Sequence, residues 1–353
     1  MGESKVQPKV LIVTLSKSLN YGAYLQAYAL QSVLQSRRLD TYFLDLYDLR
    51  QNVRRFKSLF KKNDRNFSGL IFGLKKLYQF WLAEKKFKFL KKVDGDFSAA
   101  FFGADEIWSL VNNTFVSCPE FYGLNLEGLK KYSYAPSAGN TTVEIACNNN
   151  AFRTGVRGIN RVSVRDKTTQ LIASEILGSA GIPIVLDPAF LADFPSEEFF
   201  LPFDEPYAVV YSYGLSKSRA VEIRNYADRA GLKLVSPGFN NDWCDLVVAC
   251  SPFQFLTIIQ RAQCVFTDTF HGTVFSIKYE KNFVSFARGK NKVVDLLERL
   301  NLLGAVVDDG DVSCIDEIVT CYSGSFDALR SLIDLSNNFI NECVADIFSD
   351  VGN

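Results

Sequence analysis

The sequence predicts an α/β protein built from two doubly wound domains that face a cleft. Short, continuous apolar runs, typical of strands buried on both faces of a parallel sheet, alternate with longer stretches of helical periodicity. At 353 residues the chain is too long for one typical domain and about right for two. A Pro- and acid-rich stretch at 194–206 separates two alternations, and so divides the chain into domains 1–195 and 196–353.

The first alternation begins with the apolar run 10–15, which predicts a buried strand. A loop containing Asn20 and Gly22 follows it, and then a helical apolar stripe over 25–34. Ligands of doubly wound domains gather at the carboxyl ends of strands, so this loop is a candidate binding loop. Further strands are expected at 41–46, 101–108, 159–164 and 182–186, with a strand and small-residue loop at 131–139.

Residues 50–92 interrupt this alternation with 14 Lys or Arg and only two acidic residues. The rest of the chain carries 25 basic and 37 acidic side chains. The formal net charge is therefore zero although the basic and acidic residues are unevenly distributed along the chain. Large apolar side chains are threaded among these bases, as in segments that bind an anionic membrane or lipid carrier. The alternative is a helical excursion whose apolar face packs on the domain. The balanced global charge indicates no nucleic-acid partner.

The second alternation begins with the strand pattern at 207–213. The tail at 315–347 has a helical pattern and is a candidate to pack back across the domain boundary. Between them the pattern predicts helices at 218–230, 252–262 and 293–300, and strands at 232–236, 264–267 and 282–287.

The chain's single histidine, His271, lies in a turn between a strand pattern and the helical pattern that starts at Gly272. A helix N-terminus offers free N–H groups and the positive end of the helix dipole, which together hold anions. Thr269 and Thr273 add hydroxyl donors, and an imidazole exchanges protons near neutral pH. These features predict an anion-handling site, whereas a lone histidine is otherwise most often a satisfied core residue.

Cationic side chains are expected on both sides of the cleft. Arg165 follows the strand pattern 159–164, where a planar guanidinium binds a carboxylate or phosphate through two hydrogen bonds; the alternative is a structural pair with Asp166. Three basic residues of the second half follow the strand expected at 282–287: Arg288, Lys290 and Lys292. Such a cleft suits a small, highly charged donor on the second domain and a neutral polyol acceptor on the first.

Several classes of protein are excluded by what the sequence lacks. Its eight cysteines form no C-x-x-C pair, and with one histidine we expect no metal site. Phosphate-loop, nucleophile-elbow and H-E-x-x-H motifs are missing, so hydrolases and nucleoside triphosphatases have no support. The first apolar run is too short for a signal peptide or a membrane span. We therefore expect a cytoplasmic protein, with residues 50–92 as a patch for the inner face of the membrane.

Five segments, taken in order, resemble motifs of the polysaccharide pyruvyl transferase family. The resemblance runs from about residue 10 to residue 300, and the order of the motifs carries it more than any one of them. In the second motif an alanine replaces the family's usual serine. The segments are Asn20-Tyr-Gly-Ala-x-Leu-Gln, Gly103-Ala-Asp-x-x-Trp108, Ser133-Tyr-Ala-Pro-Ser-x-Gly139, Ser163-Val-Arg-Asp166 and Thr267-x-Thr-Phe-His-Gly272.

The resemblance implies a GT-B-like fold of two Rossmann-like domains. It also implies an enzyme of capsular or exopolysaccharide biosynthesis that moves a pyruvyl group from phosphoenolpyruvate onto two sugar hydroxyls as a cyclic ketal. Phosphoenolpyruvate is then a co-substrate, no cofactor is expected, and the acceptor is a galactose-type sugar on undecaprenyl diphosphate. The implied catalytic residues are His271 and Arg165, the donor-binding ones Thr269, Gly272, Thr273, Arg288, Lys290 and Lys292, and the acceptor-binding ones Asn20, Tyr21, Gly22 and Asp105.

Two other interpretations of the sequence stay open. A nucleotide-sugar-dependent GT-B glycosyltransferase would have the same two-domain form and would bind a nucleotide diphosphate, for which the Tyr213-Gly214 loop is available. A non-catalytic subunit that binds a carbohydrate or a lipid carrier would tolerate the loss of His271 and Arg165.

Overall fold

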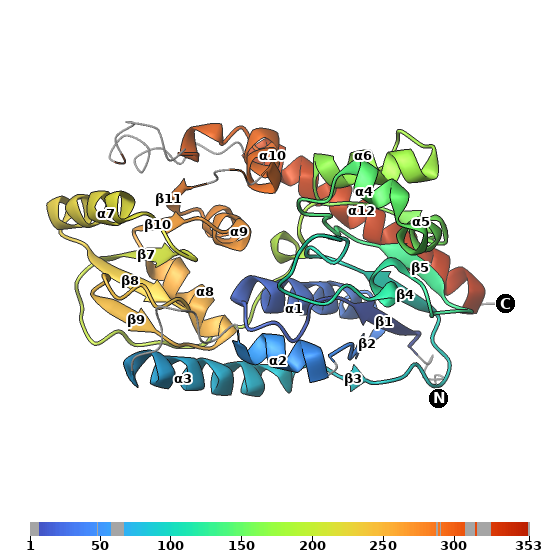
Figure 1. Ribbon diagram of the computed structural model, residues 1–353, viewed down its shortest axis with the longest axis horizontal. Helices are drawn as coiled ribbons and strands as arrows, with labels where there is room; N and C mark the ends of the chain where they lie inside the picture. Colours follow the sequence, from blue (N-terminus) through green and yellow to red (C-terminus); the bar gives the residue numbers. More distant parts are fainter. Residues whose placement is uncertain are drawn as a thin grey trace, which may run out of the picture.

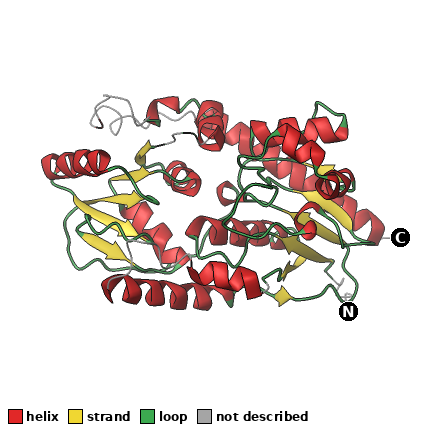
Figure 2. Cartoon of the chain, in the orientation of Figure 1, coloured by secondary structure: helices red, strands yellow, loops and turns green. Residues whose placement is uncertain are grey.

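A computed structural model of the chain describes residues 7–47, 49–57, 67–286, 289, 291–307, 315 and 326–351. It contains two parallel sheets, each with helices packed on it, in two halves that lie side by side (Figure 1). Strands and helices alternate through both halves, and long loops join them where the halves meet (Figure 2). The predicted α/β class with two doubly wound domains is confirmed.

The first sheet has the strand order β3-β2-β1-β4-β5-β6, and every pair is parallel. The chain winds outward from β1 in one direction and then, through β4, in the other. A crevice opens at such a switch point, at the carboxyl ends of the strands. The strands are β1 (Lys9–Val13), β2 (Asp40–Leu44), β3 (Phe89–Leu90), β4 (Ala99–Phe102), β5 (Lys130–Ser133) and β6 (Arg161–Val162).

Helices cover both faces of this sheet because its central strands, β1 and β4, are apolar over almost their whole length. In β1, Val10 and Ile12 pack in one apolar cluster with Leu30, whereas Leu11 and Val13 pack in another on the opposite face. The second cluster holds apolar side chains of α4 to α6. The helices of this half are α1 (Tyr21–Gln35), α2 (Leu49–Lys57), α3 (Phe67–Glu84), η1 (Pro119–Tyr122), α4 (Val143–Asn148), α5 (Asn150–Arg157), α6 (Lys167–Leu177) and η2 (Pro188–Phe190).

The second sheet has the order β11-β10-β7-β8-β9, again entirely parallel. Its switch point lies between β7 and β10, so the loops that follow these two strands face the crevice. The strands are β7 (Tyr207–Tyr211), β8 (Lys233–Pro237), β9 (Leu246–Val248), β10 (Cys264–Thr267) and β11 (Asn282–Ser285). The helices are α7 (Lys217–Ala230), α8 (Pro252–Arg261), α9 (Phe270–Lys278), α10 (Asn291–Arg299) and η3 (Leu303–Ala305).

Two helices tie the halves together. In Figure 1, α3 runs along the lower edge beneath both halves, and Lys76 on it donates a hydrogen bond of 2.8 Å to the Gly238 carbonyl of the second half. The C-terminal helix α12 (Phe326–Val351) lies against the first sheet instead of the second (Figure 1). There Asp346 accepts hydrogen bonds from Lys130 Nζ at 2.8 Å and Tyr132 Oη at 2.6 Å.

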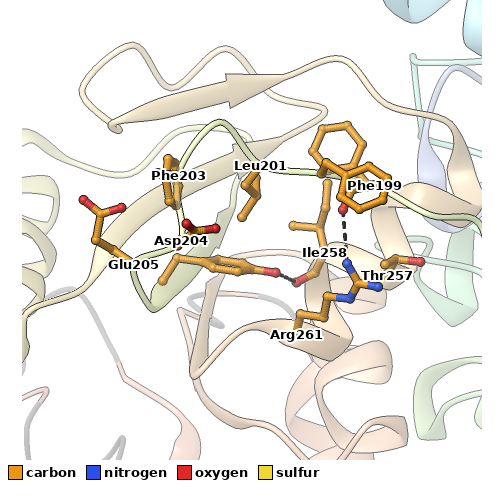
Figure 3. Close-up of a pocket in the computed structure, with 10 residues that line it drawn as sticks. Phe199, Leu201, Phe203, Asp204, Glu205, Thr257, Ile258 and Arg261 are labelled. Atoms are coloured by element: carbon orange, nitrogen blue, oxygen red, sulfur yellow. Dashed lines mark hydrogen bonds between the residues drawn. The ribbon is translucent and has the colours of Figure 1, made fainter.

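The structure differs from the predicted elements in several places. The strand expected at 101–108 ends at Phe102, and strand β3 and helices α4 to α6 were not predicted. Residues 182–186 form no strand and contribute only a single bridge between Ile184 and Val164. The short strand β9 was not predicted, because three residues are too few to show a pattern. The linker 194–206 has no helix or strand, and it borders a small pocket of about 250 Å³ (Figure 3). In this pocket Arg261 donates to the Phe199 carbonyl.

Candidate active site

A cavity of about 510 Å³ lies where the two switch points face each other. The first half contributes Asn20, Asp105 and Glu106, from the loops that follow β1 and β4. The second half contributes residues from the loops after β7 and β10 and from α10. Helices α2 and α3 close one end with further polar side chains. The lining from the second half includes Tyr213, Asp268, Thr269, His271 and Lys292, and that from α2 and α3 includes Gln51, Arg54, Arg55, Phe72 and Lys76.

His271 reaches this cavity because β10 ends in a capped helix start. Thr269 is the N-cap of α9, and its hydroxyl accepts a hydrogen bond of 2.8 Å from the Gly272 N–H. Thr267 Oγ1 in turn donates to the Tyr211 carbonyl at 2.7 Å, which fixes the turn to the neighbouring strand. The imidazole is the second side chain of α9 and lies at the cavity wall, largely buried.

The first half supports the imidazole from the other side through Gly22. A Cβ atom built on Gly22 would lie 2.2 Å from both Cγ and Nδ1 of His271, so no side chain fits there. Asn20 places this glycine, since it caps α1 and accepts hydrogen bonds from the N–H groups of Gly22 and Ala23. Gly22 thus lets the two halves close on the imidazole, which is a packing role instead of the predicted contact with the acceptor.

A buried carboxylate, Asp187, bridges the imidazole and a guanidinium. Its Oδ2 lies 3.0 Å from Arg165 Nη1 and 3.4 Å from His271 Nε2, and its Oδ1 accepts from the Ala189 N–H at 3.0 Å. Burial alone would raise the pKa of Asp187, but His271 and Arg165 outweigh it and hold this pKa below its ordinary value. Arg165 and Asp187 come from the first half and His271 from the second, so the network exists only where the halves meet.

Arg165 lies behind the cavity wall, not in it. Its guanidinium carbon is 4.3 Å from the centre of the Phe270 ring, and only 4% of the residue is exposed. Among the described residues its Nε and Nη2 have no hydrogen-bond partner, and neither does His271 Nε2 by strict geometry. The predicted direct contact of Arg165 with the donor therefore does not agree with this structure, in which the guanidinium does not reach the cavity. The guanidinium fixes Asp187, and it leaves two donors free beside the imidazole.

Lys292 is the predicted donor-side cation that the structure places at the cavity. It forms an ion pair across the cleft with Glu106, a first-half residue that the sequence analysis did not single out. Burial would raise the pKa of Glu106, but the Lys292 charge more than offsets this and lowers that pKa. Arg288 and Lys290, the other two predicted cations, lie outside the described residues.

Three further predicted contacts need correction, because their side chains or N–H groups have other partners. Thr273 is completely buried and donates to the Thr269 carbonyl at 3.2 Å, away from the cavity. The Gly272 N–H is used by the N-cap, and a Cβ on Gly272 would lie 2.1 Å from Thr267 Oγ1. Tyr21 is buried between the halves, where its ring stacks on Phe255 at 4.9 Å; it is an interdomain packing residue.

Besides Glu106, sequence reasoning missed Asp187 and Arg54 at the site. Asp187 was not singled out, although a carboxylate between a buried run and a helical turn is a usable signal. Arg54 lines the cavity from α2 and donates to the Phe115 carbonyl at 2.8 Å. Its charge was assigned to the basic insertion as a whole, and only the fold shows that Arg54, Arg55 and Lys76 of this insertion border the cavity. Within the described ranges, no group of His, Cys, Asp and Glu side chains is arranged to hold a metal ion.

Solved structures with a similar arrangement share very little sequence with this chain. They include S. aureus MnaA with UDP (12% identity, TM-score 0.47, 93% of this chain and 88% of that one). The glycosyltransferase SnogD from Streptomyces nogalater has 11% identity and a TM-score of 0.48, with 97% and 99% covered. UDP-GlcNAc 2-epimerase from Neisseria meningitidis bound to UDP-GlcNAc has 9% identity and a TM-score of 0.47, with 94% and 93% covered.

A search of curated proteins finds no match. The sequence profile of one family, described as polysaccharide pyruvyl transferase, matches residues 20–290. This range begins at the N-cap of α1, includes Arg165, Asp187 and His271, and ends beyond β11. It covers both halves of the cavity and most of the chain. The chain therefore belongs to the polysaccharide pyruvyl transferase family.

Proposed function

We propose that this pyruvyl transferase uses phosphoenolpyruvate as its donor and forms a cyclic ketal on two hydroxyls of one sugar. The observation that carries the proposal is the network of Arg165, Asp187 and His271, in which the imidazole lies at the wall of a polar interdomain cavity and the other two side chains lie behind it. A phosphoenolpyruvate molecule carries a phosphate and a carboxylate, and this wall offers cationic groups and a group that exchanges protons. We propose a galactose-type acceptor on undecaprenyl diphosphate, in the synthesis of a capsular or other surface polysaccharide.

The proposed reaction has two stages. One sugar hydroxyl attacks the central carbon of phosphoenolpyruvate, while the methylene carbon gains a proton and becomes a methyl group. The carbon–oxygen bond to phosphate then breaks, and the second hydroxyl closes the ketal. Of the two protons that leave the sugar, one is equivalent to the proton gained by the methyl group, and the other accompanies inorganic phosphate. No electrons are exchanged with a cofactor.

His271 is the proposed group for proton transfer. Asp187 orients its imidazole through Nε2 and stabilises the imidazolium when it forms, as a buried carboxylate does for a catalytic histidine. The first turn of α9 offers the N–H groups of Phe270 and His271 to an anion, since a helix cannot bond these groups internally. Lys292 would help to hold the donor, and Asn20 and Asp105 would contact the sugar.

The test is turnover with a panel of lipid-linked sugars, followed by phosphate release and by mass spectrometry for a pyruvyl adduct. Replacing His271 by Ala should lower the rate roughly 10²–10⁴-fold while the fold survives. Near wild-type turnover of a pure, folded His271→Ala protein would remove the imidazole from the mechanism. Thermal stabilisation by UDP or GDP, but not by phosphoenolpyruvate, would contradict the choice of donor.

A further inference from the structure

Helix α3 exposes an unusual apolar face. Seven of its large apolar side chains are exposed, including Phe67 at 78%, Tyr78 at 57% and Trp81 at 52%. Their spacing of three and four residues places them along one side of the helix. A stripe of this length exceeds the scattered single side chains of an ordinary surface, so it marks an interaction site. The stripe consists of Phe67, Leu70, Ile71, Leu74, Tyr78, Trp81 and Leu82.

The opposite face of α3 anchors the helix to both halves of the protein. Gly69, Gly73, Lys76, Phe80 and Ala83 are buried there. The Ala83 carbonyl accepts from Tyr24 Oη at 2.8 Å, and the Phe80 ring packs on the Tyr21 ring at 5.0 Å. Because this face already supplies the contacts that hold α3, the exposed stripe is not needed for folding of the cleft.

The exposed stripe is accompanied by an excess of positive charge on α3 and on the segment that follows it. Lys85 lies 3.8 Å from the centre of the Trp81 ring, so one ammonium group is held beside an exposed aromatic ring. The single carboxylate between residues 67 and 92, Glu84, is in an ion pair with Arg55. Asp94 and Asp96 follow beyond the last lysine and do not cancel the excess. The exposed lysines on and after α3 are Lys75, Lys85, Lys86, Lys91 and Lys92, together with Lys88, which pairs with Asp40.

We propose that this face of α3 docks on an anionic lipid bilayer, with its apolar stripe in the interface and its lysines on the headgroups. Apolar side chains that include tryptophan and tyrosine, rimmed by lysine, match the chemistry of that surface. A second protein copy would have to accommodate the same excess of positive charge on both sides of a symmetric interface. No helix in the described part of the chain is both long and apolar enough to cross a bilayer.

Helix α3 carries the docking face on one side and lines the cavity on the other. Phe72 and Lys76 of α3 line the interdomain cavity, and the exposed stripe lies across the helix from Lys76. A helix with its side chains is about 10–12 Å wide, so the cavity would stand roughly that far above the membrane surface. Resting on the proposed function, this arrangement brings a sugar tethered to a membrane lipid within reach of His271, with Arg54 of the adjoining α2 on the way.

The experiment is co-sedimentation of the full-length protein with vesicles of phosphatidylcholine alone or mixed with phosphatidylglycerol. We expect binding to the anionic vesicles that weakens in high salt. Leu74→Asp should reduce the bound-to-free ratio about tenfold and Lys75→Glu about fivefold. The matched controls, Leu171→Asp on α6 and Lys217→Glu on α7, change exposed residues elsewhere and should bind like the wild type.

Equal pelleting of Leu74→Asp, Lys75→Glu and the wild type would overturn the docking surface. So would a concentration-dependent dimer that Leu74→Asp dissociates, together with no vesicle binding. Because the assay contains neither donor nor acceptor, its result does not depend on the proposed reaction. Turnover of a water-soluble acceptor by Leu74→Asp reports on the reaction separately, and should equal that of the wild type.

Discussion

At the residue scale, Asp187 is the side chain on which the site depends most. It is fully buried and contacts a cation from each half of the molecule, Arg165 and His271. Removing one partner of a buried, charged network leaves the others without compensation, which is more costly than the loss of a surface pair. Both the chemistry and the fold should therefore respond to substitutions here.

The first prediction is that Asp187→Asn lowers the turnover rate roughly 10²–10⁴-fold, because the amide neither orients the imidazole correctly nor stabilises imidazolium. The variant should still bind phosphoenolpyruvate, which calorimetry checks. Unchanged turnover would mean that the carboxylate serves only the fold.

The second prediction concerns pH and stability. The pKa of Asp187 in the folded protein lies below its ordinary value of 3.8, because His271 and Arg165 favour the charged form. A depressed folded pKa adds stability above the ordinary value, and this stability is lost as the pH falls through the lower folded value. The gap in urea midpoint between the wild type and Asp187→Asn should narrow as the pH falls below about 4. A gap that widens on acidification would contradict this sign.

The third prediction uses the close approach of Gly22 to His271. An added methyl group would lie 2.2 Å from the ring, so Gly22→Ala must displace the imidazole. Displacement by about 1 Å is expected to lower turnover about 10²-fold, and the overpacking should lower the free energy of unfolding by about 1–3 kcal/mol. Gly181→Ala is the matched control, because nothing lies within 4 Å of its Cβ position. Equal activity of the two variants would show that the site tolerates the shift.

At the element scale, the start of α9 shows what the sequence could and could not predict. The strand, the turn and the helix at 264–278 were predictable, since apolar runs and capping residues act over a few neighbours. The pattern also predicted hydroxyl groups near His271, but it could not show which groups they hydrogen-bond. Thr269 caps the helix and Thr273 points into the domain, because tertiary packing decides which face of a short helix is open.

The fourth prediction follows from that cap. Replacing Thr269 by Ala should lower the free energy of unfolding by about 1 kcal/mol, since the Gly272 N–H loses its acceptor. Thr269→Ser keeps the hydroxyl and should recover most of this loss. Urea denaturation of both variants measures the difference. If the serine variant were as destabilised as the alanine variant, the methyl group of Thr269, and not its hydroxyl, would be the stabilising part.

At the scale of the whole molecule, contacts between residues far apart in the sequence determine which side chains meet at the site. Sequence patterns cannot show these contacts. The two parallel sheets followed from local hydrophobic periodicity, and three of the five family motifs contribute residues to the cavity lining. The contact between Asp187 and His271 spans 84 positions, and Tyr21 meets Phe255 across an even longer separation. No periodicity connects such residues. The predicted roles of Arg165 and Tyr21 therefore missed which side of the cavity wall each side chain occupies.

The fifth prediction tests how α12 holds the first half. Asp346→Ala would leave Tyr132 Oη, on a fully buried residue, without its acceptor, and should cost about 1–3 kcal/mol of unfolding free energy. Glu342→Ala on the same helix breaks an exposed pair with Arg161 and should cost less than about 1 kcal/mol. Chemical denaturation compares the two. Equal effects would mean that the hydrogen bond between Asp346 and Tyr132 is not what fixes the helix.

The network around Asp187 is divided between the two halves, so it is complete only while the halves are closed. Because the carboxylate and the imidazole belong to different lobes, any hinge opening that admits or releases a ligand also pulls the acid–base pair apart. An open enzyme would then hold its donor beside an imidazole that no carboxylate orients. For the proposed phosphoenolpyruvate donor, we expect this geometry to slow wasteful hydrolysis until a sugar has arrived and the lobes have shut.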